Sequence, residues 1–252
     1  MRLWLALVGS LLGSWAGLSG RAHALGEREK MAIAQIAYSG NWNPRPTATR
    51  RLAWEIDKRT SIDCAEPVEV RLSDEAQLRR YPLLYLAGAD ALPAFDDAEV
   101  AHLRRHLQAG GMLIIDGASG RPGGAFDQSV RRLIKRLFSK EPLERLSEDH
   151  VIYKAFYLLR APVGRIAAVP YLEAVQHDGR AAVVYSQNDM AGAWARDNLG
   201  QWEHDVYPGG DAQREMAFRL GINLVMYALC LDYKSDQVHV PFILRRRQWQ
   251  SR

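Results

Sequence analysis

The clearest hydrophobic pattern lies in the middle of the chain. Two short apolar runs, residues 83–87 and 112–115, flank a segment in which Val100, Leu103 and Leu107 recur at helical spacing. Strands that are apolar throughout are typical of a parallel sheet covered by helices on both faces. The pattern therefore predicts a strand–helix–strand unit and an α/β fold with a mostly parallel central sheet.

The same kinds of pattern continue on both sides of this unit. Apolar or alternating runs predict strands at residues 31–39, 67–72, 171–176 and 180–185. Apolar positions three or four residues apart predict helices at residues 48–59, 74–80, 97–109, 128–138 and 212–229. Asp178-Gly179 is typical of a hairpin turn. Residues 186–211 are expected to form a long polar loop, and 238–244 a further edge strand.

The first 24 residues have the features of a signal peptide. Arg2 precedes an apolar run rich in small residues, and Ala22-His23-Ala24 matches the small-x-small pattern of a cleavage site. An uncleaved anchor is the alternative, but the run is interrupted by Gly and Ser and is short for a bilayer span. We therefore expect cleavage after Ala24 and a single domain over residues 25–252. The mature protein is expected to be periplasmic or secreted, with no membrane span.

Charge and cysteine content exclude two classes of function. The formal net charge is +4, and removing Arg2 and Arg21 with the signal peptide leaves 4 − 2 = +2. A balance this small, without a stripe of Lys and Arg, argues against nucleic acid as a partner. Cys64 and Cys230 do not have the spacing of a metal site. Export would permit a disulfide between them, but two separate thiols are expected.

Polar and aromatic residues follow several of the predicted strands. Ligands of open α/β sheets bind outside the carboxyl ends of the strands, which are expected to gather these loops at one edge. The candidate ligand-binding residues are Asn41, Trp42, Asn43, Arg45, Asp90, Asp116, Asp127, Asn188, Asp189 and Trp194. Acids and amides suit sugar hydroxyls, and indole rings suit the flat faces of sugars. Ordering of the loops by these same side chains is the alternative.

Asp116 is the candidate for chemistry, because it stands at the end of a buried strand beside a glycine-rich loop. It could act as a general base, a metal ligand or a helix cap. The glycine-rich loop lacks the Lys-Ser/Thr ending of a nucleotide-binding loop, and no Gly-x-Ser-x-Gly elbow is present. We therefore expect no cofactor and no metal.

Several segments together resemble a bacterial family known as domain of unknown function 4159. They are residues 38–46, 81–88, the Gly110-Gly111 turn with Asp116, Phe126-Asp127, and residues 219–229. The resemblance implies a flavodoxin-like (Rossmann-like) three-layer sandwich similar to class I glutamine amidotransferases. It implies no established activity. Because the nucleophile elbow is missing, glutaminase activity is not expected.

Three interpretations of function follow. The first is an exported, non-catalytic module that binds a polar ligand, such as a glycan, or an envelope protein. The second is a hydrolase of envelope carbohydrate or peptide, in which Asp127, Asp189 or His150 assists Asp116. The third is an assembly subunit whose final helix, 212–229, presents an exposed apolar stripe to a partner.

Overall fold

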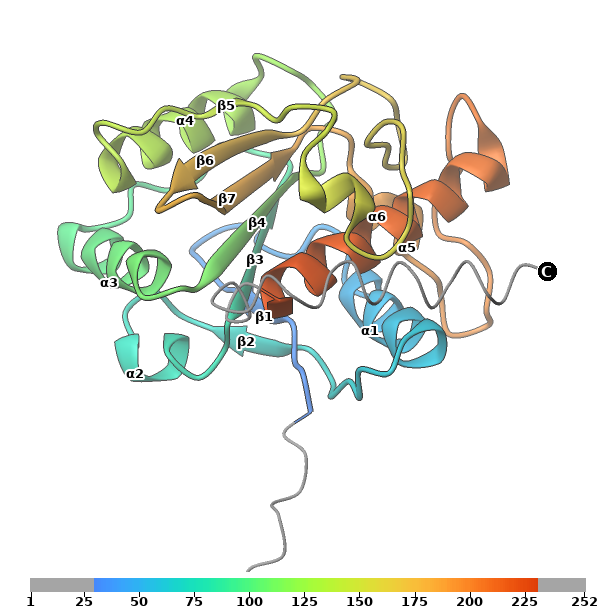
Figure 1. Cartoon of the computed structure of the whole chain (residues 1–252), viewed down its shortest axis with the longest axis horizontal. Coiled ribbons are helices and arrows are strands. Elements are labelled where there is room, and N and C mark those ends of the chain that lie inside the picture. Colours follow the sequence, from blue (N-terminus) through green and yellow to red (C-terminus); the bar gives the residue numbers. More distant parts are fainter. Residues whose placement is uncertain (1–29, 231–252) are drawn as a thin grey trace, which may run out of the picture.

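A seven-stranded sheet forms the centre of the computed structural model, which describes residues 30–230 (Figure 1). The strands lie in the order β2-β1-β3-β4-β7-β6-β5. Their bounds are β1 Ala34–Ile36, β2 Val68–Val70, β3 Leu83–Gly88, β4 Met112–Gly117, β5 Glu144–Arg145, β6 Glu173–His177 and β7 Arg180–Ser186. The first five strands in spatial order are parallel; β6 pairs antiparallel with β7, and β5 pairs antiparallel with β6. The fold is therefore mixed α/β with a mostly parallel sheet, as the sequence predicts.

Helices cover both faces of the sheet (Figure 1). One face carries α1 (Ala48–Arg59), the 3₁₀ helix η1 (Val151–Lys154), α5 (Met190–Trp194) and α6 (Gly210–Cys230). The other carries α2 (Glu75–Leu78), α3 (Asp97–Gln108) and α4 (Ala125–Leu137). We call these the α6 face and the α4 face. Each has its own hydrophobic core, so side chains that alternate along a strand belong to different cores.

The predicted strand–helix–strand unit is confirmed. Every residue of β3 and β4 is buried, and the two strands pair in parallel from Leu83 opposite Met112 to Gly88 opposite Gly117. Between them, Asp96 caps α3 by accepting the backbone N–H of Glu99. The Glu99 side chain accepts the backbone N–H of Asp96 in return, which completes a capping box.

The hairpin at Asp178-Gly179 is also confirmed. Both residues have positive φ, +49° and +73°, and they connect the antiparallel strands β6 and β7. This is the backbone geometry that Asp-Gly favours in a two-residue turn.

Three predicted elements differ from the structure. β1 covers three residues of the predicted 31–39, and α4 begins at Ala125 rather than at Gln128, so Asp127 lies in its first turn. Residues 186–211 are not a continuous polar loop, because they contain the fully buried helix α5. A five-residue helix is too short to show helical periodicity in its sequence.

Helix α6 does not present an exposed apolar stripe. Its apolar residues from Phe218 onward are buried or half-buried, with Met226 and Leu229 packed against the core. The structure therefore removes the reason for the third interpretation, an assembly subunit that uses this helix.

Within residues 30–230, no helix is long and apolar enough to cross a membrane. Cys64 and Cys230 are free thiols, with Cys64 half-buried and Cys230 exposed. The predicted signal peptide and the strand at 238–244 lie outside the described residues.

Candidate functional site

Asp116 lies near the carboxyl end of β4, on the α6 face, and is fully buried. Its carboxylate accepts three hydrogen bonds. The Tyr85 hydroxyl donates to Oδ2 at 2.8 Å, the backbone N–H of Met190 donates to Oδ1 at 2.9 Å, and that of Ala191 donates to Oδ2 at 2.8 Å. Asp116 therefore attaches the start of α5 to the central strand of the sheet.

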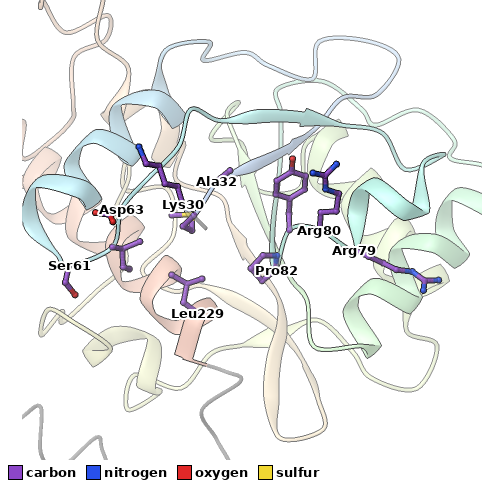
Figure 2. A pocket seen from close by; sticks show the side chains of 11 residues that line it. Lys30, Ala32, Ser61, Asp63, Arg79, Arg80, Pro82 and Leu229 are labelled. Atoms are coloured by element: carbon purple, nitrogen blue, oxygen red, sulfur yellow. The ribbon is translucent and has the colours of Figure 1, made fainter. Parts of the chain in front are cut away.

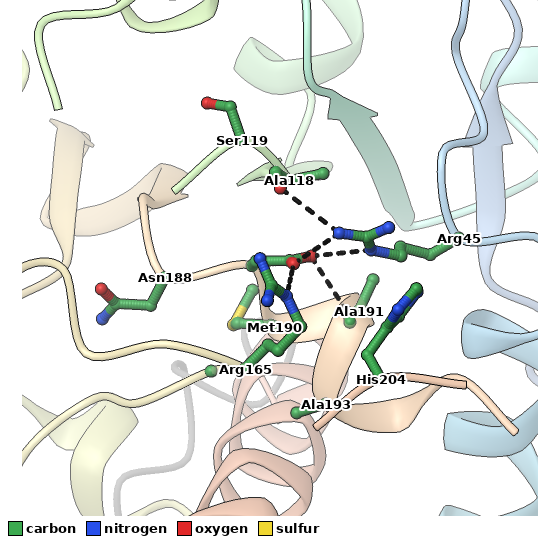
Figure 3. Close-up of polar contacts among 12 residues, drawn as sticks. Arg45, Ala118, Ser119, Arg165, Asn188, Met190, Ala191, Ala193 and His204 are labelled. Atoms are coloured by element: carbon green, nitrogen blue, oxygen red, sulfur yellow. Dashed lines mark hydrogen bonds and ion pairs between the residues drawn. The ribbon is translucent and has the colours of Figure 1, made fainter. Parts of the chain in front are cut away.

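Asp189 is another buried carboxylate on this face, with no exposed surface. Arg45 binds it in a bidentate manner, from Nε to Oδ1 at 3.1 Å and from Nη2 to Oδ2 at 2.7 Å. Nε of Arg165 also donates to Oδ2, and the backbone N–H of Gly192 donates to Oδ1 at 3.0 Å. Figure 3 shows both guanidinium groups converging on this carboxylate. Asp189 therefore joins two distant loops to α5.

Burial and charge act together on Asp116. Removal from solvent, and then the nearby charge of Asp189, raise its pKa from 3.8 to about 7. The hydrogen bonds from Ala191 and Met190 oppose this shift, because they stabilise the ionised form. Near neutral pH, Asp116 is therefore poised between its protonated and ionised forms.

The raised pKa of Asp116 predicts a dependence of stability on pH. Between about pH 4 and pH 7 the folded protein holds a proton on Asp116 that the unfolded chain has lost, so this group's contribution to stability falls as pH rises. From pH 5 to pH 8, the free energy of unfolding should therefore decrease more in the wild type than in Asp116→Asn. Urea unfolding at both pH values measures this difference. An equal change in the two proteins would show that Asp116 does not titrate in this range.

Asn188 and Trp194 are buried and His150 is half-buried, and all three make structural contacts. Asn188 is fully buried, and its side chain bonds to backbone groups of Pro162 and Val169. The indole N–H of Trp194 donates to the Ala217 carbonyl at 3.0 Å, and the ring is 1% exposed. His150 caps η1 through Nδ1. For these three residues the geometry agrees with the loop-ordering alternative.

Asp127 lies in the first turn of α4, on the opposite face of the sheet from Asp116. Asp127 pairs with Arg131 at 3.0 Å, and Arg131 also binds Glu173 at 2.9 Å. Asp116 instead contacts α5 and Tyr85 on the α6 face. The two residues are separated because Asp116 projects from β4 toward the α6 face, whereas Asp127 belongs to α4, which packs on the other face.

The remaining candidates surround the ends of β1 and β3. Asn41 and Asp90 are exposed and Trp42 is half-buried, whereas the Asn43 amide oxygen accepts from Gln35 at 3.1 Å. Asn43 is half-buried as well, so all four side chains reach solvent and can contact a ligand.

Aromatic side chains fill the space beside the end of β3. The Tyr38 hydroxyl donates to the Ala87 carbonyl at 2.9 Å. A Cβ atom at Gly88 would lie 2.6 Å from that hydroxyl and 2.4 Å from the ring of Phe126. A ligand at this edge would therefore bind over the loops rather than between the strand ends.

Comparison with known families agrees with the resemblance in the sequence. Residues 32–229 match the family described as domain of unknown function (DUF4159). The chain belongs to this family. The match spans the whole sheet of this DUF4159 domain, including the cluster around Asp116 and Asp189. No curated protein matches the chain.

Two residues of this cluster in the DUF4159 domain were not singled out from the sequence: Tyr85 and Arg165. Tyr85 has only the pattern of a buried strand, and Arg165 lies in an irregular stretch without periodicity. His204 lies beside Arg45 in Figure 3, and burial, followed by the charge of Arg45, lowers its pKa. No signal in the sequence separates these residues from other buried tyrosines or surface cations.

Two further observations concern metal binding and a hollow elsewhere on the sheet. Among residues 30–230, no group of three or more His, Cys, Asp or Glu side chains could hold a metal ion. A hollow of about 940 Å³ lies at the opposite edge of the sheet, where Lys30, Arg80 and Leu229 surround it (Figure 2). None of the candidate residues predicted from the sequence lines that hollow.

Proposed function

We propose that the protein is an exported, non-catalytic α/β module that binds a polar ligand or an envelope partner at the carboxyl edge of its sheet. One observation carries the proposal. Asp116 and Asp189, the acids best placed for chemistry, are fully buried, and every carboxylate oxygen of both accepts at least one hydrogen bond from the protein. A general base needs access to the proton that it removes, which this arrangement does not provide.

The order of the parallel strands supports a closer assignment of the fold. The spatial order β2-β1-β3-β4-β7 equals the flavodoxin-like order 2-1-3-4-5 when β7 is counted as the fifth parallel strand. We therefore propose a flavodoxin-like sandwich similar to class I glutamine amidotransferases, without their activity. Export, and hence a periplasmic or secreted location, rests on the signal-peptide pattern of residues 1–24.

Binding at the edge loops can be tested with Trp42. The mature chain from Leu25 would be screened against bacterial envelope glycans, and binding by Trp42→Ala compared with the wild type. Because tryptophan is enriched among the residues that dominate recognition, we expect about tenfold weaker binding or more. Trp54→Ala is the matched control, since Trp54 is a 48%-exposed tryptophan on α1. If the wild type captures no glycan or envelope protein, or both variants bind like the wild type, the proposal fails.

The hydrolase interpretation remains as a second candidate because of one observation. Asp116 has a pKa of about 7 and lies close enough to Asp189 for that charge to contribute to the shift. A carboxyl group that titrates near neutrality can serve as a general acid. Release of reducing ends or amines from envelope polymers, abolished in Asp116→Asn, would favour this function over the first.

A further inference from the structure

Arg45 and Arg165 use only part of their hydrogen-bonding capacity. Arg45 gives Nε and Nη2 to Asp189, with a longer contact of 3.5 Å from Nη2 to the Ala118 carbonyl, and Arg165 gives Nε alone. The other three terminal nitrogens, Nη1 of Arg45 and both Nη atoms of Arg165, bond to no residue between 30 and 230. None of these three nitrogens is a fully buried atom that lacks a hydrogen-bond partner. Within the described residues, these N–H groups are therefore left for a ligand.

The two guanidinium groups are held in place although they reach the surface. Their side chains are 18% and 28% exposed, and both are anchored on the same fully buried carboxylate of Asp189. The backbone adds to this restraint, because the N–H of Arg165 donates to the Asp189 carbonyl at 2.8 Å and its own carbonyl accepts from Tyr207 at 2.8 Å. Little side-chain freedom remains to be lost when a ligand binds, which favours affinity.

The geometry points to an oxyanion as the ligand of this pair. We propose that Arg45 and Arg165 bind a carboxylate or phosphate group of the molecule recognised at the sheet edge. This inference rests on the proposed function and names the ligand's chemical class. Guanidinium N–H groups match the planar or tetrahedral oxygens of such groups, and charge-assisted bonds are stronger than neutral ones. His204 lies beside Arg45 and forms the rim of the site (Figure 3).

Glu203 is the acid that opposes this binding. Its carboxylate accepts from the Thr47 hydroxyl, and its charge acts on both Arg45 and His204. Replacing it with glutamine keeps an acceptor for Thr47 and removes the repulsion. Glu203→Gln should therefore bind an oxyanion more tightly than the wild type does, which a purely structural role for the arginines would not produce.

The test is titration of the full chain at constant ionic strength and pH 7. The probes are inorganic phosphate and galacturonate, with glucose as the neutral comparison, and the readout is NMR shifts of backbone amides around Ala118 and His204. We expect saturable shifts with phosphate, galacturonate or both, but not with glucose. The stronger of the two probes identifies whether the natural group is a phosphate or a carboxylate.

Variants separate a specific site from general electrostatics. Arg165→Gln should weaken binding about tenfold or more, because it removes charge-assisted bonds. Arg165→Lys keeps the charge and the contact with Asp189, so it should fold normally and lose part of the affinity. Arg160→Gln removes an exposed charge from the same loop and should bind like the wild type.

Two outcomes would overturn the inference. In the first, Arg165→Gln and Arg160→Gln bind the probes equally well. In the second, neither oxyanion produces a saturable shift. If a neutral glycan or an envelope protein still binds through Trp42, the proposed function stands and only the oxyanion assignment fails. If nothing binds at the edge, both fail together.

Discussion

Replacing Asp189 with asparagine should lower the free energy of unfolding by about 3–5 kcal/mol, the usual cost of breaking a buried ion pair by removing one partner. The side chain has no exposed surface and binds both Arg45 and Arg165. Asparagine tolerates the positive φ of +52° at this position, so the loss would come from charge rather than from backbone strain. Urea unfolding at pH 7 measures it.

The control for this experiment is Asp205→Asn. Asp205 is exposed and follows His204, so the same chemical change should alter stability by no more than about 0.5 kcal/mol. If Asp189→Asn were as stable as Asp205→Asn, the two arginines would not depend on Asp189. Asp189 would then not hold the two guanidinium groups of the oxyanion site in place.

Trp194→Ala should cost about 3–5 kcal/mol of stability, as for other large-to-small changes in a core. The indole is 1% exposed and donates its N–H to Ala217. It packs so closely on α6 that a Cβ atom at Gly221 would lie 2.8 Å from its ring. Trp194→Phe keeps most of the apolar contact and should cost less. Thermal or urea unfolding distinguishes the two variants.

This experiment also decides between the two interpretations of Trp194. Trp54→Ala, at the exposed indole of α1, should leave stability within about 0.5 kcal/mol of the wild type. A structural Trp194 predicts a large loss of stability and unchanged ligand affinity in the folded fraction. Loss of glycan binding by Trp194→Ala at unchanged stability would instead make it a ligand contact.

Local sequence determined most of the architecture. The apolar runs of β3 and β4, the capping box at Asp96 and the Asp178-Gly179 turn each act within a few residues, so their patterns can be recognised without the fold. The strand–helix–strand unit then sets the parallel sheet, because a right-handed crossover connects neighbouring strands in nearly all such units. The position of candidate residues near strand ends also followed from this pattern.

Only the tertiary structure decided what those candidate residues do. The Asp116 carboxylate accepts hydrogen bonds from backbone N–H groups of α5, which lie more than 70 positions later in the chain. Arg45 donates to Asp189, which lies 144 positions away. Asp127 is separated from both because α4, the helix that carries it, packs on the other face of the sheet. Burial and pairing depend on contacts between segments distant in sequence, which no local pattern specifies. For that reason the sequence by itself predicts the acids at the strand ends, while the fold determines that they are buried and leaves the arginines facing solvent.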